Sequence, residues 1–302
     1  MNIIRMTGGL GNQMFQYALY LKFKKLGIDC CFEDFTEYEN HANARPICLS
    51  CFGIDYPKAS RSVYNEYTDS DMSLKSRFRR KIFGRKSREY AEKGPEFDPG
   101  VLEKDNAYLT GYFQSEKYFE DIKDEISKTF VFTDAVKIKA AGILADNDLR
   151  GLLSTDITSA NVFRDNVVSV HVRLGDYLDA ASIYGGICTD EYYEKAMDYM
   201  CGHIENPEFL IISNDADACD VKFSGYRERG MKIHILRGTV EDNGYIDMYL
   251  MSSCAHNIIA NSSFSWWGAY LNPNPNKIVI APSRWTNPHP QEDIYTGAMI
   301  KM

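Results

Sequence analysis

The sequence predicts an α/β protein built from two Rossmann-like halves that face each other across a cleft. Its 302 residues are enough for two domains of ordinary size. Through the second half, short apolar runs alternate with helical patterns, which is typical of a mainly parallel sheet covered on both faces. The polar stretch 149–165 has no strong periodicity, so we predict domains 1–158 and 159–302.

The first half opens with an apolar run, a glycine-rich loop and a helical pattern. Residues 2–6 predict a strand, and residues 7–13 form the loop. A helix follows, with Met14, Tyr17, Ala18, Leu21 and Lys25 near one face, and Gly27 ends it. Residues 28–32 predict the next strand.

A second helix is predicted after Gln114. Ser115 is its expected N-cap. The buried stripe is expected to be formed by Tyr118, Phe119, Ile122 and Ile126.

The second half is more regular. Strands are predicted at residues 167–172, 209–212, 233–236, 257–260 and 278–281, and helices near 190–200, 243–253 and 264–271. In sheets of this kind, ligands bind at the carboxyl ends of the strands, so the loops that follow the strands are the candidate functional segments.

Charge and hydropathy exclude two classes of function. The chain has 34 Lys and Arg against 42 Asp and Glu, a net charge of −8, which argues against nucleic acid as a partner. No segment reaches the roughly 18 uncharged apolar residues of a membrane span, and the first residues do not form a signal peptide. We therefore expect a cytoplasmic protein.

The loop at residues 8–13 is suited to a phosphate. Gly9 and Gly11 allow a close backbone approach, and the following helix presents free N–H groups, with Asn12 beside them. A dinucleotide fingerprint would need a third glycine where Met14 stands, and no Gly-Lys-Ser/Thr of a P-loop follows. The alternative is a tight turn without a ligand.

The strand at 167–172 runs directly into a charged segment, His171-Val-Arg173-Leu-Gly-Asp176. If the strand continues, His171 and Arg173 point to one face. A guanidinium is well suited to a diphosphate because it carries a permanent charge and several donors in one plane. The alternatives are a structural pair of Arg173 with Asp176 and a histidine satisfied in the core.

Two more loops follow predicted strands. Asp215 and Asp217 come after the strand predicted at 209–212, and a carboxylate there can accept hydrogen bonds from a ribose or a base. Their spacing also matches a metal-binding Asp-x-Asp pattern. Alternatively, Asp217 could simply cap the next helix. Ser262, Ser263 and Phe264 open the helix after 257–260, which again forms an anion site. For the adjacent pair 266–267 we expect one tryptophan in the core and the other at the cleft.

Five segments together resemble the α-1,2-fucosyltransferases of glycosyltransferase family 11. They are spread along nearly the whole chain in family order, at residues 8–17, 111–119, 171–177, 213–215 and 261–268. The resemblance implies a GT-B-like fold, GDP-L-fucose as donor, a β-galactoside fucosylated at O2 with inversion, and no metal or other cofactor. It also implies that Asp215 contacts the nucleotide. The expected acceptor is an oligosaccharide or a lipid-linked glycan.

The resemblance assigns roles to residues of both domains. The N-terminal domain would take the acceptor and the C-terminal domain GDP-fucose. Arg173 corresponds to the arginine that grips the β-phosphate in related fucosyltransferases, whereas Leu174 replaces a second arginine common in the family. Substrate contacts are expected from Gly9, Gly11, Asn12, His171, Asp215, Ser262, Ser263 and Phe264. Asp176 is the candidate base, although it could merely hold Arg173, and a phosphate oxygen could take the proton instead.

A basic segment at 75–88 contains eight Lys or Arg and no acid. Leu74, Phe78 and Ile82 would form an apolar stripe on a helix there. We favour a surface helix packed through that stripe, with peripheral membrane contact through 74–88 as the alternative.

Three other functions fit parts of the sequence. A nucleotide-dependent dehydrogenase could use Glu33 or Asp34 on a ribose, but it lacks the third glycine. A sugar-binding module would explain the aromatic content of 13% but not Arg173. A GDP-fucose-dependent transferase that acts on another acceptor or sugar position fits all the motifs.

Overall fold

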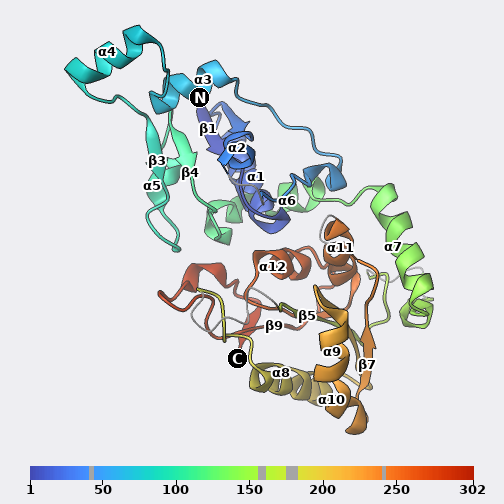
Figure 1. Cartoon of the computed structure of the whole chain (residues 1–302). Coiled ribbons are helices and arrows are strands. Elements are labelled where there is room, and N and C mark those ends of the chain that lie inside the picture. Colours follow the sequence, from blue (N-terminus) through green and yellow to red (C-terminus); the bar gives the residue numbers. More distant parts are fainter. Residues whose placement is uncertain (41–43, 156–160, 175–182, 240–242) are drawn as a thin grey trace. The chain divides into compact units, whose positions relative to one another are not determined.

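A computed structural model describes residues 1–40, 44–155, 161–174, 183–239 and 243–302 (Figure 1). The chain divides into two compact units, Met1–Thr129 and Phe130–Met302. This division falls earlier than the predicted boundary at 158/159. The reason is helix α7 (Asp134–Asp146), which packs against α11 (Tyr245–Ser253) of the second unit. Its residues Val136, Ala140 and Leu144 are buried at helical spacing.

The first unit contains a four-stranded parallel sheet with the strand order β2-β1-β4-β3. The strands are β1 (Asn2–Arg5), β2 (Cys30–Glu33), β3 (Glu89–Ala91) and β4 (Tyr108–Thr110). The helices are α1 (Leu10–Lys25), α2 (Thr36–Asn40), α3 (Arg61–Thr68), α4 (Leu74–Phe83), α5 (Pro99–Leu102) and α6 (Lys123–Thr129). The strands predicted at 2–6 and 28–32 are confirmed as β1 and β2.

Helix α1 follows the glycine-rich loop as predicted. Met14, Tyr17, Ala18 and Leu21 are buried, as the apolar pattern requires. The helix ends before Gly27, whose φ of 73° lies in the left-handed region. Glycine adopts this conformation at little cost, so it ends helices of this kind.

The helix predicted after Gln114 is wrong as a continuous element. Two 3-10 turns, Glu116–Tyr118 and Glu120–Ile122, precede α6, and the backbone between them leaves helical geometry at Phe119. Ser115 caps the first turn, since its Oγ accepts a hydrogen bond from Lys117 N at 3.2 Å. The predicted stripe is nevertheless buried, with Phe119 and Ile126 fully inaccessible.

The basic segment forms α4, but its predicted packing is wrong. None of the residues of α4 is buried, and Leu74, Phe78 and Ile82 are 82%, 67% and 55% exposed. The i, i+4, i+8 spacing therefore identified a common face but not a partner that covers it.

The second unit contains a six-stranded parallel sheet with the order β10-β9-β8-β5-β6-β7. Its strands are β5 (Val167–Val172), β6 (Glu208–Ser213), β7 (Lys232–Ile235), β8 (His256–Ile258), β9 (Val279–Ala281) and β10 (Met299–Lys301). The helices are α7, α8 (Asp190–His203), α9 (Ala216–Lys222), α10 (Ser224–Glu228), α11 (Tyr245–Ser253) and α12 (Ser263–Tyr270). Counted from β5, this is the 3-2-1-4-5-6 order of doubly wound nucleotide-binding sheets, read from the opposite edge.

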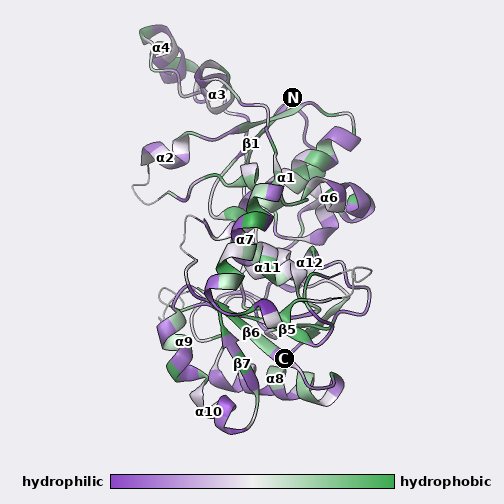
Figure 2. Ribbon diagram, turned by 90° about the vertical axis from the view of Figure 1, so that its right-hand side faces the viewer, coloured by the Kyte–Doolittle hydropathy of each residue, from purple (hydrophilic) through white to green (hydrophobic). Residues whose placement is uncertain are grey.

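The second sheet is covered on both faces, as its continuous apolar strands require. Alternate residues of β5, Val168, Val170 and Val172, pack in one cluster with α8 and α9. His171, between them in the strand, contacts α12 on the other face. Figure 1 shows α8 and α12 on opposite sides of this sheet, and β5 and β6 stand out as hydrophobic ribbons in Figure 2.

Within the ranges that the structure covers, no helix combines the length and the apolar character that crossing a membrane requires.

Candidate functional site

The centre of the second sheet contains the topological switch point of the unit. Strands β5 and β8 are hydrogen-bonded neighbours, while the helices that follow them, α8 and α12, cover opposite faces. A crevice opens between the two loops that leave such a strand pair, and ligands bind there. The loops are the Arg173–Leu174 segment and the Asn261–Ser263 segment. Two of the motifs predicted from the sequence therefore meet at this point.

His171 is the last buried polar residue before the first loop. It is 5% exposed, and its ring lies 5.8 Å from that of Phe264 at the start of α12. Burial, and to a smaller extent the nearby charge of Arg173, lower the pKa of His171 to about 3. The imidazole is therefore neutral at physiological pH, and no described residue hydrogen-bonds its buried Nδ1.

Arg173 borders a cavity of about 260 Å³ at the carboxyl end of β5. Lys222, at the end of α9, lines the same cavity and forms an ion pair with Asp190. Burial lowers the pKa of Lys222, opposed by the nearby Cys188 thiol. Asp190 lines the cavity as well and offsets the charge of Lys222, so Arg173 supplies the net positive charge of the hollow, which favours an anionic ligand. No sequence motif indicates Lys222.

Leu174 stands where the resembled motif commonly has a second arginine. Both its backbone N–H and its backbone C=O are hydrogen-bonded to one side chain, that of Asn214. Asn214 accepts a hydrogen bond from Leu174 N at 3.0 Å and donates one to Leu174 O at 3.2 Å. The Leu174 side chain packs against the apolar cluster beneath α8. Asn214 thus fixes the loop after β5 to the loop after β6. The sequence does not indicate this role, although Asn214 lies in the segment 213–215 that resembles the family.

Asp215 starts α9 as its N-cap and accepts a hydrogen bond from Ala218 N at 2.9 Å. The prediction that Asp217 could cap this helix is wrong, because Asp217 is 90% exposed and pairs with Arg237. Asp215 itself remains exposed at the carboxyl end of β6, next to β5. Within the described residues, no group of three or more His, Cys, Asp or Glu side chains is arranged to hold a metal ion.

The loop after β8 is fixed by Asn261, which is 1% exposed. Its amide nitrogen donates to Tyr184 O and Trp285 O, each at 3.1 Å. Ser262 is the N-cap of α12 and accepts a long hydrogen bond from Phe264 N at 3.4 Å, while Ser263 begins the helix, partly exposed.

Both tryptophans of α12 are fully buried, which corrects the prediction that one borders a cleft. The Nε1 of Trp266 donates to Ile294 O at 2.7 Å, and the ring of Trp267 lies 5.1 Å from that of Phe130. They anchor the helix whose first residues form the loop.

In the first unit, the glycine-rich loop is shaped by Gly8. Its φ is 77°, and a Cβ at this position would lie 2.5 Å from Asn12 Nδ2. Gly9 is the N-cap of α1 at an ordinary φ of −74°, and Gly11 is buried in the first turn. The residue of this loop whose positive φ requires glycine is therefore Gly8, whereas the predicted contact residues were Gly9 and Gly11.

The loop after β1 is joined to the loop after β4, the neighbouring strand. Gln114 Nε2 donates to Asn12 Oδ1 at 2.7 Å. Gln16, fully buried, donates to Gly111 O at 3.0 Å and accepts from Thr7 N. Gln13 similarly donates to Gly8 O at 2.8 Å. Two motifs about a hundred residues apart in sequence thus form one structure.

The predicted site residues therefore fall into two groups, one in each unit. His171, Arg173, Asp215 and the 262–264 segment lie at the carboxyl end of the second sheet, and Gly9, Gly11 and Asn12 lie at that of the first. The cleft predicted between the domains stays a prediction. Asp176 lies outside the described residues.

Comparisons with known proteins agree with this architecture. The model of the family described as glycosyl transferase family 11 matches residues 89–298. An alpha-1,2-colitosyltransferase from Escherichia coli is 29% identical over 298 residues, covering 94% of this chain and 91% of that protein. The galactoside 2-alpha-L-fucosyltransferase Sec1 of Mus musculus is 26% identical over 279 residues, covering 89% of this chain and 63% of that protein.

Among solved structures, a mutant of Arabidopsis thaliana FUT1 in complex with GDP matches with a TM-score of 0.51 and 14% identity, covering 93% of this chain and 70% of that one. At this identity the likeness concerns the fold alone, and it confirms the predicted GT-B-like class with two Rossmann-type units. Because the family model matches most of its length, this chain belongs to glycosyltransferase family 11.

Proposed function

We propose that this chain transfers L-fucose from GDP-L-fucose to O2 of a terminal β-galactoside. The product would carry an α-1,2 linkage and belong to a glycan or a surface polysaccharide. The observation that carries the proposal is the cavity beside the switch point, where Arg173 supplies the net positive charge beside the Lys222–Asp190 ion pair. A diphosphate leaving group needs such a preorganised field. Membership of the family and its similarity to a galactoside 2-alpha-L-fucosyltransferase support the choice of reaction.

The donor is assigned to the second unit and the acceptor to the first. Arg173 holds the β-phosphate, together with the N-terminal end of α12, where Ser262 and Ser263 lie. Neutral His171 and the exposed carboxylate of Asp215 recognise guanine or ribose. Gly9, Gly11 and Asn12 remain candidates for the pyrophosphate or the fucose. Phe264 contributes by packing against His171.

In the reaction, the O2 oxygen of galactose attacks C1 of fucose on the face opposite to the phosphate. The C1–O bond to the β-phosphate breaks, its electron pair leaves with GDP, and the configuration at C1 inverts. Arg173 stabilises the charge that grows on the diphosphate. The O2 proton passes to a carboxylate, for which Asp176 is our candidate, or to a phosphate oxygen of the leaving group. No metal or other cofactor is required in this proposal.

A donor and acceptor panel tests the proposal. GDP-L-fucose is offered with lactose, N-acetyllactosamine or Galβ1-3GalNAc, with and without EDTA, and the product linkage is determined. We expect fucosylated product linked to O2 of galactose and equal rates in EDTA. Product linked at another position would instead support a GDP-fucose-dependent transferase of different specificity.

The role of Arg173 is tested by Arg173→Ala. Loss of a preorganised donor of this type costs roughly 10²- to 10³-fold in kcat. Arg229→Ala serves as the matched control, because Arg229 pairs with Glu194 and Asp198 on the exposed side of α8. Wild-type turnover by a folded Arg173→Ala variant would remove Arg173 from the mechanism.

A second donor follows from one comparison, the similarity to an alpha-1,2-colitosyltransferase. Colitose differs from fucose only by the missing 3-hydroxyl, so both sugars suit a similar pocket. Competition between GDP-L-fucose and GDP-colitose for the same acceptor discriminates between them through the ratio of kcat/KM values. A ratio in favour of colitose would replace fucose as the donor without changing the role of Arg173.

A further inference from the structure

Helix α4 exposes several large apolar side chains to solvent, and none of its residues is buried in the core of its unit. Leu74, Phe78, Ile82 and Phe83 are all more than half exposed, and Met72, just before the helix, is 74% exposed. The helix has regular ends: Ser73 is its N-cap, with Oγ accepting from Ser76 N, and Gly84 follows it at a φ of 74°. In Figures 1 and 2, α4 stands away from the strands of its own unit.

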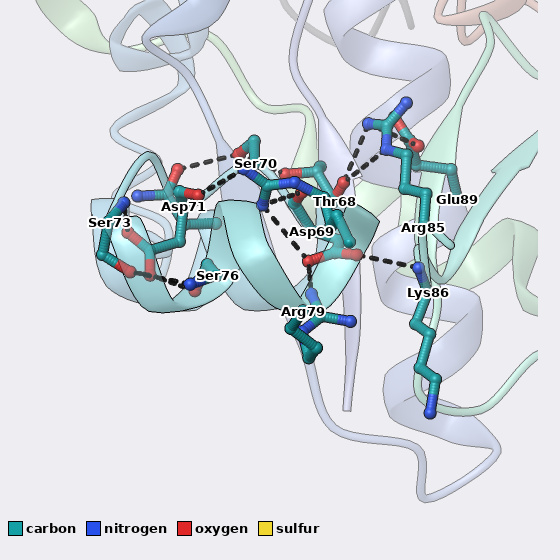
Figure 3. Close-up of polar contacts among 12 residues, drawn as sticks. Thr68, Asp69, Ser70, Asp71, Ser73, Ser76, Arg79, Arg85, Lys86 and Glu89 are labelled. Carbon is teal, nitrogen blue, oxygen red and sulfur yellow. Dashed lines mark hydrogen bonds and ion pairs between the residues drawn. The ribbon is translucent and has the colours of Figure 1, made fainter. Parts of the chain in front are cut away.

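Polar contacts, rather than apolar packing, hold α4 to the protein (Figure 3). Asp69, which is 7% exposed, pairs with Arg79 and Arg80 and accepts from Lys86 N at 2.8 Å. The pKa of Asp69 is lowered mainly by that Lys86 hydrogen bond. The carboxylate of Asp71 accepts hydrogen bonds from the hydroxyls of Ser73 and Ser76 at 2.7 and 2.6 Å. Both ends of the segment are therefore fixed to one turn.

An ordinary surface helix packs its apolar face against the protein and turns its polar face to solvent, and in α4 this arrangement is reversed. With about 100° per residue, Leu74, Phe78 and Ile82 lie on one side, and Ser76, Arg79 and Arg80 lie on the other. The second group is the half-buried one that contacts the protein, so the apolar stripe faces outward. Lys75, Arg77 and Lys81 flank the stripe and are exposed, and their side chains form no ion pair or hydrogen bond with any residue that the structure describes.

We propose that α4 lies on the surface of an anionic phospholipid bilayer, with its apolar stripe among the acyl chains and Lys75, Arg77 and Lys81 at the headgroups. This docking surface consists of Leu74, Phe78 and Ile82 and those three basic residues. Amphipathic helices of this composition bind interfaces through their apolar area and their attraction to anionic lipid. The chain as a whole carries a net charge of −8, so the attraction must come from this local cluster.

Charge favours a bilayer over a second copy of this chain. Two copies that met through the stripe would bring Lys75, Arg77 and Lys81 of each helix together, and like charges repel. An anionic surface offers complementary charge to all three. This inference does not depend on the donor or the acceptor of the proposed reaction, and its test uses no activity measurement.

The test is co-sedimentation of the full chain with vesicles of phosphatidylcholine alone or mixed with phosphatidylglycerol. We expect binding only to the mixed vesicles, and less of it as the salt concentration rises. The double variant Leu74→Ser/Phe78→Ser should lower the partition coefficient by roughly tenfold or more, because each large apolar side chain that enters the bilayer adds to the free energy of binding. Arg77→Glu/Lys81→Glu should lower it by roughly tenfold or more.

The matched control is Val131→Ser/Ile138→Ser, which removes two exposed apolar side chains, 54% and 72% accessible, from the second unit. It should bind as the wild type does. Circular dichroism checks that every variant is folded. Equal binding of the control and α4 variants, binding that ignores lipid charge, or no binding of the folded wild type to mixed vesicles would each overturn the proposal. Concentration-dependent self-association that only the Leu74→Ser/Phe78→Ser variant abolishes, without vesicle binding, would do the same and indicate a second copy as the occupant.

A second measurement locates the contact. The three native tryptophans are at most 1% exposed, so Phe78→Trp adds an accessible indole on the apolar stripe of α4. Vesicles that contain phosphatidylglycerol and brominated lipid should quench this added emission, whereas they should leave the wild-type emission unchanged. If vesicles bind but the added indole is not quenched, the docking surface lies elsewhere.

Discussion

Acid sensitivity at His171 tests the electrostatics of the candidate donor site. The pKa of the buried imidazole is lowered to about 3, first by burial and second by Arg173. In the unfolded chain a histidine titrates near pH 6.5. Between these two values the unfolded state binds more protons than the folded state. Stability therefore falls as the pH is lowered from about 6.5 towards 3, and this loss is absent above pH 6.5.

The magnitude follows from the distance between the two pKa values. A pH of 5 lies about 1.5 units below the pKa of histidine in the unfolded chain, while His171 in the folded protein is still neutral. This difference lowers the free energy of unfolding by about 2 kcal/mol, at 1.36 kcal/mol per unit. Replacement by Asn removes the titrating group. The free energy of unfolding of the wild type should therefore fall by about 2 kcal/mol more than that of His171→Asn when the pH changes from 7.5 to 5.0.

Urea denaturation at the two pH values measures this difference, and NMR titration of the imidazole measures the pKa directly. Arg173→Gln should raise the pKa of His171, although burial keeps it below 6.5, because it removes only the smaller of the two causes. An imidazole that titrates near 6.5 in the folded protein, or variants with the same acid sensitivity as the wild type, would refute the burial of His171 beside Arg173.

Two further predictions concern single side chains. Burial raises the pKa of Asp247, at the start of α11, from its ordinary 3.8 to about 7. Between these two values the folded state binds more protons than the unfolded state, so the wild type loses stability as the pH rises from about 4 to about 7, by about 4 kcal/mol at 1.36 kcal/mol per unit, and the loss stays constant above pH 7. Asp247→Asn should therefore be more stable than the wild type by up to about 4 kcal/mol in urea denaturation at pH 8.5, with little gain at pH 4, and an equal gain at both would show that the charge is not the cause. Gly8→Ala should cost roughly 1–2 kcal/mol, whereas Gly9→Ala, where a Cβ meets nothing within 4 Å, should be nearly neutral; equal losses would contradict the geometry of the loop.

The sequence was most informative where burial is complete. The run 167–172 was predicted with the same bounds as β5, because a strand buried on both faces is continuously apolar between polar ends. The start of α12 is predicted to within one residue, since the capping residue Ser262 follows shortly after the apolar run 257–260. Charged and capping residues just after such strands then indicate the loops at the carboxyl end of the second sheet.

Short and irregular elements escaped prediction for physical reasons. Strands β3, β4 and β10 have three residues each, too few to show a period, whereas the equally short β8 and β9 overlap the apolar runs 257–260 and 278–281. The 3-10 turns after Ser115 bury the same side chains as a helix would, so the stripe alone does not distinguish them. The exposed stripe of α4 shows the same limit, because periodicity identifies which residues share a face and not what covers that face.

The motifs that identify the family combine two kinds of residue, and the structure separates them. Gln13, Gln16, Asn214 and Asn261 direct their amide groups at backbone atoms of neighbouring loops. An amide can donate and accept at once, so it fixes two loops where a charged side chain could satisfy only one type of partner. Position along a motif therefore does not show which residue meets the substrate. The residues whose side chains point instead to a shared hollow, above all Arg173, are the ones in which substitution should change kcat rather than stability.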